Sequence, residues 1–180
     1  MTTTSKYPTK DHRRFFEKRC QSYDWEKMFS IIAAVAKEFS GQDAEDPTIK
    51  MAMRIGLGPF IRYSTDFCGE LNGYLATAGA LKAYNKIGRI NPYKKTNEPV
   101  GPHFMEHLIP VSQFTQEIIA NPTIENIRKM FKKQRIVYVL RTEQKKYDVG
   151  DFKKKRSDKD IKAFKATYGI TDLPDTPEKQ

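Results

Sequence analysis

The chain of 180 residues carries a formal net charge of +10, and its 38% hydrophobic and 30% charged residues allow one domain with a core and argue against wholesale disorder. Its two cysteines belong to no Cys-x-x-Cys pair and no Cys/His cluster, which argues against a structural zinc site. The sequence shows no signal-peptide pattern and no apolar run of about 18 residues, so we expect no membrane partner and a cytoplasmic (intracellular) protein.

The first half of the chain is predicted to be helical after a loose, polar arm over residues 1–21. An amphipathic helix is expected over residues 22–40, where hydrophobic residues recur at helical spacing before a glycine. A short helix is expected to follow and to fail at the two glycines and the proline of residues 56–59. A longer helix is expected from residue 64 or 65 to residue 86, which completes a helical region over residues 22–90.

The second half is predicted to combine short strands with helices, which gives an α+β fold. A linker is expected over residues 91–102, where prolines and a glycine break regular structure. The region 103–170 is then expected to contain a strand over residues 104–109, a helix starting at Thr123, a strand over residues 136–140 (IVYVL) and a basic helix from Ser157 to Gly169. Residues 171–180 are expected to form a disordered tail.

Positive charge is concentrated in the C-terminal third of the chain. Residues 124–165 contain 15 Lys or Arg against 6 Asp or Glu, a balance of +9, so the rest of the chain carries about +1. Such a segment attracts polyanions, and a nucleic acid is therefore the partner that we expect. The alternatives are Lys-rich faces that are merely solvated and a basic segment that docks onto an acidic protein.

Two of the three histidines lie in one segment, PHFMEHLIP, at residues 102–110. Its Glu106-His107 pair places a carboxylate beside an imidazole at the end of a predicted strand. Hydrolysis of a phosphodiester bond uses such a pair, because a neutral imidazole takes a proton from attacking water while a carboxylate holds Mg²⁺ against the phosphate. Neighbouring strand residues point to opposite faces, so both groups need a strand end or a turn to reach one site. The alternative is an ordinary strand-end pair.

The residues EHLIP, from Glu106 to Pro110, resemble the first half of the HNH, or ββα-metal, nuclease motif. Its core reads as an acidic residue, His, an aliphatic residue, any residue and Pro. The resemblance covers about residues 102–150 and implies His107 as the general base. It also implies Glu106 as a catalytic residue that binds Mg²⁺ or another divalent cation.

In that family a second strand and a short helix follow, and the helix supplies a further ligand, commonly Asn or His. Here residues 136–140 stand in the place of the strand and residues 142–148 in the place of the helix start. By resemblance we assign Glu143 as the second metal ligand, with Gln144 as the alternative. This sequence departs from the family pattern in the middle Asn and the closing His, although Asn121 lies between the two halves.

The expected fold is a mostly helical N-terminal half, then a small ββα-like unit and a basic C-terminal helix. The expected function is a metal-dependent endonuclease that cuts DNA, in a phage, restriction or mobile-element setting by family analogy. The alternative is a non-enzymatic nucleic-acid-binding or packaging protein, in which the charge acts alone. The residues expected to contact the nucleic acid are His103, Lys129, Lys132, Lys133, Arg141, Lys145, Lys146, Lys153, Lys154, Lys155 and Arg156.

Overall fold

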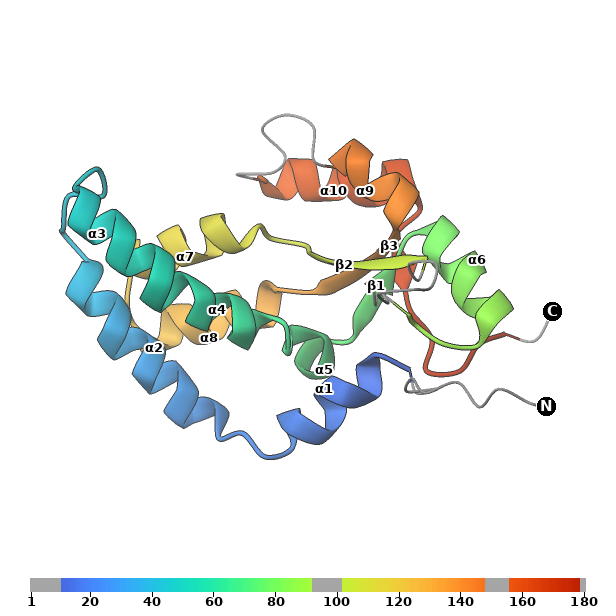
Figure 1. Ribbon diagram of the computed structural model, residues 1–180, viewed down its shortest axis with the longest axis horizontal. Helices are drawn as coiled ribbons and strands as arrows, with labels where there is room; N and C mark the ends of the chain where they lie inside the picture. Colours follow the sequence, from blue (N-terminus) through green and yellow to red (C-terminus); the bar gives the residue numbers. More distant parts are fainter. Residues whose placement is uncertain (1–10, 92–101, 148–155, 179–180) are drawn as a thin grey trace, which may run out of the picture.

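The computed structural model describes residues 11–91, 102–147 and 156–178, without the side chains of residues 15, 18 and 145–147, and its fold is α+β (Figure 1). Its helices are α1 (Arg13–Cys20), α2 (Trp25–Phe39), α3 (Pro47–Ala52), α4 (Gly58–Thr65), α5 (Cys68–Asn72), α6 (Ala78–Ile87), α7 (Val111–Ala120), α8 (Ile124–Lys133), α9 (Arg141–Tyr147) and α10 (Asp158–Tyr168). Its strands are β1 (Tyr74–Ala76), β2 (His103–His107), β3 (Ile136–Leu140) and β4 (Thr171–Asp172). Within the described ranges, no helix combines the length and the apolar character needed to cross a membrane.

The sheet has the strand order β2-β3-β1-β4, so β2 lies at one edge. β2 pairs with β3 in antiparallel fashion, with His107 opposite Ile136, and β1 pairs with β3 in parallel. One face of the sheet packs against α6, whose Tyr84 is buried with Tyr138 of β3. The other face packs against α10, whose Phe164 is buried with Val137 and Val139. α9 follows β3 directly, so β2, β3 and α9 form the expected unit of two strands and a helix.

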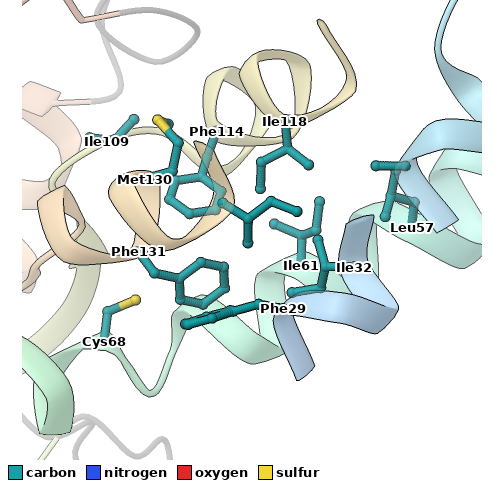
Figure 2. Packing of buried hydrophobic residues seen from close by; sticks show 12 residues of the cluster. Phe29, Ile32, Leu57, Ile61, Cys68, Ile109, Phe114, Ile118, Met130 and Phe131 are labelled. Carbon is teal, nitrogen blue, oxygen red and sulfur yellow. The ribbon is translucent and has the colours of Figure 1, made fainter. Parts of the chain in front are cut away.

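A second core lies among α2, α4, α7 and α8, on the side of the molecule away from α6 (Figure 1). Phe29 and Ile32 of α2 and Ile61 of α4 point toward Phe114 of α7 and Phe131 of α8 (Figure 2). α7 and α8 come from the chain between β2 and β3, whereas α2 and α4 precede the expected linker. This helical core therefore joins both halves of the sequence, and the two halves are not separate units.

The long helix expected from residue 64 or 65 to residue 86 is wrong. α4 ends at Thr65, α5 spans five residues, and Gly73 adopts a φ of +79°, a conformation that favours glycine. The chain then forms β1, whose three residues are buried and pair with β3, before α6 begins. Burial between β3 and β4 thus outweighs the helical propensity of this stretch. The short helix also continues further than expected, through a π-helical turn (Met53–Leu57) into α4.

Both ends of the chain contribute more structure than expected. Where a loose arm is expected, α1 begins at residue 13, and the His12 ring beside it is buried, with Nδ1 3.1 Å from the Tyr138 hydroxyl. This burial lowers the pKa of His12 to about 4. Where a disordered tail is expected, β4 pairs with β1, and Leu173 is buried. Arg13 donates to the carbonyl oxygen of Pro174 and so connects the two ends.

The turn that follows β2 is held by the buried side chain of Gln134. Its Oε1 accepts a hydrogen bond from the backbone N–H of Ile109 at 2.9 Å, and its Nε2 donates to the Ile109 carbonyl at 2.8 Å. Gln134→Leu leaves both backbone groups without these partners, so we expect a loss of about 2–4 kcal/mol in the free energy of unfolding, measured by urea denaturation. Gln116→Leu, on the exposed side of α7, is the matched control and is expected to change little. Equal effects of the two substitutions would contradict this role.

Candidate functional site

A cavity of about 380 Å³ lies beside the edge strand β2. Glu106 and His107 of β2 line this cavity, and residues of the turn after the strand line it as well. α4 and α9 each contribute one polar side chain, Arg62 and Gln144 respectively. The remaining lining residues are Phe104, Met105, Pro110, Val111, Ser112 and Arg156.

The edge position of β2 explains how two consecutive residues reach one cavity. Glu106 and His107 point to opposite faces of the strand, as alternation requires. No described strand pairs with the outer edge of β2, and His107 is the last residue of the strand. Side chains from both faces therefore border a space that runs along this edge. The Glu106-His107 pair therefore lies at a strand end, the position from which both side chains can reach one site.

His107 is nearly buried, at 7% exposure, and one ring nitrogen faces α4. Its Nε2 lies 3.2 Å from the Thr65 hydroxyl and 3.1 Å from Asp66 Oδ1. The contact with Asp66 has the distance of an ion pair without the alignment of a hydrogen bond, and Oδ1 is a buried atom with no hydrogen-bond partner among the described residues. The described residues offer Nδ1 no hydrogen bond. α4 therefore holds one side of the imidazole of a residue that lines the cavity.

Gln144, not Glu143, accompanies Glu106 and His107 at the cavity. Glu143 accepts hydrogen bonds from the Thr77 hydroxyl at 2.6 Å and from the backbone N–H of Leu140 at 2.8 Å. It thereby caps the start of α9 and contacts the first turn of α6, where a negative charge is favourable. Glu143 thus has a capping role and does not line the cavity with Glu106, whereas Gln144, the alternative ligand, does. Gln144 is the next residue of α9 and has no hydrogen bond within the described part of the chain.

The side chain of His103 is fully buried, which disagrees with its expected contact with a nucleic acid. Its Nδ1 accepts a hydrogen bond from the backbone N–H of Asn91, and its Nε2 donates to the carbonyl oxygen of Ala80, each at 3.1 Å. Both ring nitrogens are thus used, and desolvation lowers the pKa of His103. The expected contact is wrong, and His103 joins β2 to α6.

Arg156 is also buried, at 5% exposure, and this contradicts its expected role as a surface phosphate contact. Its Nη1 donates to the backbone carbonyls of His107 at 2.9 Å and Leu108 at 3.0 Å. Its guanidinium also lies over the ring of Phe164, 4.8 Å from the ring centre. Arg156 therefore fixes the end of β2 from within the molecule, although part of it reaches the cavity wall.

The other predicted cations occupy different surroundings. Lys129, Lys132 and Lys133 are exposed on α8 and do not line the cavity. Arg141 lies over the ring of Phe104, 5.4 Å from its centre, and Phe104 lines the cavity. The side chains of Lys145 and Lys146, and the residues Lys153, Lys154 and Lys155, lie outside the described part of the chain.

The donor set of the cavity is sparse. Among the described residues, no three His, Cys, Asp or Glu side chains converge as a metal-binding group. Zinc prefers a closed set of such ligands, whereas Mg²⁺ usually takes one or two carboxylates together with waters and substrate phosphates. The Glu106 carboxylate and the Gln144 amide oxygen therefore fit Mg²⁺ better than Zn²⁺. Asn121, the other candidate, lies in the turn between α7 and α8 and accepts a hydrogen bond from Thr123.

The sequence-based site lacks Arg62 and Thr65 of α4 and its C-cap residue Asp66. Their spacing of three and four positions places them on one face of a helix, which is a usable signal. The prediction began a helix at residue 64 or 65 and so divided this face. The Arg62 side chain is exposed at the cavity and makes no ion pair with a described residue.

Comparison of the chain with protein-family models, curated proteins and solved structures finds no match.

Proposed function

We propose that this chain is a metal-dependent endonuclease that hydrolyses phosphodiester bonds in DNA, with His107 as the general base. One observation carries the proposal: Glu106, His107 and Gln144 line one cavity, although His107 and Gln144 lie 37 positions apart along the chain. They come from a strand, the end of that strand and the helix after the paired strand. This is the order of elements that the HNH resemblance implies.

Each residue has a distinct role in the proposed reaction. His107 takes a proton from a water molecule as the water oxygen attacks the phosphorus. Glu106 and Gln144 would hold Mg²⁺ or another divalent cation, which when bound neutralises charge on the phosphate. Arg62 contacts a phosphate oxygen, since its guanidinium is exposed at the cavity. Pro110 and Val111 also line the cavity, next to the end of β2.

Incubation of the full chain with supercoiled plasmid tests the activity. We expect conversion to the nicked form in Mg²⁺ or Mn²⁺ and none when EDTA removes the metal. Glu106→Gln keeps the size of the side chain and removes its charge, so we expect this variant to require a higher metal concentration. The proposal fails if the wild type never nicks DNA at any metal concentration. It also fails if EDTA leaves the rate unchanged.

Binding of the nucleic acid is proposed to depend on the exposed Lys residues of α8. Each phosphate contact contributes a slope of about −0.9 to the dependence of log binding constant on log salt concentration. Replacing Lys129, Lys132 and Lys133 together by Gln is therefore expected to reduce the slope by up to about 3. Filter binding of duplex DNA across a salt series measures it.

The matched control replaces Lys27, Lys37 and Lys86 by Gln, because these residues are also exposed and the change in net charge is the same. We expect this control to retain most of the slope. Equal loss in both variants would show that net charge, and not the α8 surface, attracts the DNA. Salt-sensitive binding by a wild type that never cuts would instead identify a non-enzymatic binding protein.

A further inference from the structure

We infer that Thr65 and Asp66 are positioning residues that fix His107 with its proton on Nε2 and its lone pair on Nδ1. The inference deepens the proposed function and rests on it, since a general base needs a free lone pair at the reacting water. It assigns a role in the reaction to α4, which belongs to the helical core and not to the HNH-like unit.

The hydrogen bonds of Thr65 determine which ring nitrogen carries the proton. The Thr65 hydroxyl donates its hydrogen to the backbone carbonyl of Arg62, at 2.9 Å. Its oxygen then faces His107 Nε2 at 3.2 Å as an acceptor, so Nε2 must be the donor. A neutral imidazole carries one proton, and Nδ1 therefore keeps its lone pair. Asp66 Oδ1, 3.1 Å from Nε2, favours the same arrangement, because a carboxylate repels a lone pair at this distance.

The charge of Asp66 becomes important when the ring accepts a proton. The water O–H bond breaks, its proton joins Nδ1 and the water oxygen forms a bond to phosphorus, while Nε2 keeps its own proton. The P–O bond to the leaving sugar oxygen breaks, and this oxygen leaves with the electron pair and takes a proton from solvent. The ring is then positive, and Asp66 stands beside it with a buried oxygen that no described hydrogen bond satisfies. A charge placed in advance where the reaction creates the opposite charge stabilises the transition state. Asp66 acts on the reaction through His107, without contact to the substrate.

The position of α4 is itself well defined. Thr65 is fully buried, and Asp66 is the C-terminal cap of the helix, one residue before the buried Phe67. α4 packs in the helical core through Ile61, which is fully buried beside Phe114 of α7. The distances from α4 to His107 therefore depend on the helical core. We expect that the unit of β2, β3 and α9 alone does not hold the imidazole in this orientation.

The nitrogen chemical shifts of the His107 ring, measured by NMR on the full chain at a pH where the ring is neutral, test the tautomer directly. We expect the proton on Nε2 in the wild type. We expect loss of this preference in the double variant Thr65→Val, Asp66→Asn, whose side chains have nearly the original shapes. His103 is the internal reference, because its proton is also on Nε2 and its partners are unchanged. A proton on Nδ1 in the wild type, or an unchanged tautomer in the double variant, overturns the inference.

Plasmid nicking then tests the contribution of Asp66 to the rate. Asp66→Asn is expected to lower kcat by on the order of 10²-fold with little change in KM, because the substrate does not contact Asp66. Ser64→Ala, a buried neighbour on α4 that bonds to the Phe60 carbonyl, is expected to lower the melting temperature and to leave kcat unchanged. An unchanged kcat in Asp66→Asn overturns the role of Asp66. A wild type without activity refutes the proposed function, and the NMR result still decides the tautomer.

Discussion

His107→Ala is expected to lower the rate of plasmid nicking by about 10²- to 10⁴-fold, the usual contribution of a general base. The remaining rate reflects substrate binding and charge neutralisation at the cavity, which the substitution leaves in place. Imidazole added to the solution is expected to restore part of the rate, because it can enter the space that the ring vacates and accept the proton. Rates measured over a series of imidazole concentrations check this result.

His103→Asn is the control from the same strand. His103 is fully buried, and both of its ring nitrogens bond to backbone atoms, so the substitution is expected to lower the melting temperature. Below that temperature the nicking rate is expected to equal that of the wild type. If His107→Ala cuts as fast as the wild type, the assignment of the base to His107 is wrong. If the two variants lose activity in parallel with stability, the effect of His107 is structural.

The elements with strong local signals were predicted correctly from the sequence. The amphipathic helix expected over residues 22–40 is confirmed, although α2 begins at Trp25 with Asp24 as its cap. The helix from Thr123, the strand over residues 136–140 and the last helix with its Ser157 cap and Gly169 stop are confirmed as well. β1 was missed because its three residues carry no alternation, and their pairing with β3 lies far away in the sequence. α7 was not predicted either, because its apolar residues can be assigned to a buried helix face only when the helical core that they pack in is known.

The candidate site shows the same division between local and distant information. The five residues EHLIP are enough to predict Glu106 and His107 at a strand end, and the structure brings both to one cavity with Gln144. The sequence favours Glu143 over Gln144, but Glu143 bonds to Thr77, 66 positions earlier, and no local pattern indicates that contact. Thr65 contacts His107 although the two residues lie 42 positions apart along the chain, and Asp66 is the next residue. Their role therefore depends on tertiary packing.

Arg156→Met is expected to lower the free energy of unfolding by about 3 kcal/mol, which for a chain of this size corresponds to a fall of roughly 6–12 °C in melting temperature. The substitution keeps an apolar stem against Phe164 and removes the donors to the carbonyls of His107 and Leu108. Both acceptors then lose a charge-assisted hydrogen bond at the end of the edge strand, where no described strand replaces it. Calorimetry measures the melting temperature.

Arg128→Met is the matched control, because Arg128 forms its ion pair with Glu26 at the surface, at 2.6 Å. Surface ion pairs contribute little to stability, so we expect a melting temperature near that of the wild type. If the two substitutions have equal effects, the buried hydrogen bonds of Arg156 are not what holds the end of β2. If Arg156→Met strongly lowers stability and leaves salt-dependent DNA binding unchanged, Arg156 stabilises the fold and does not contact the nucleic acid.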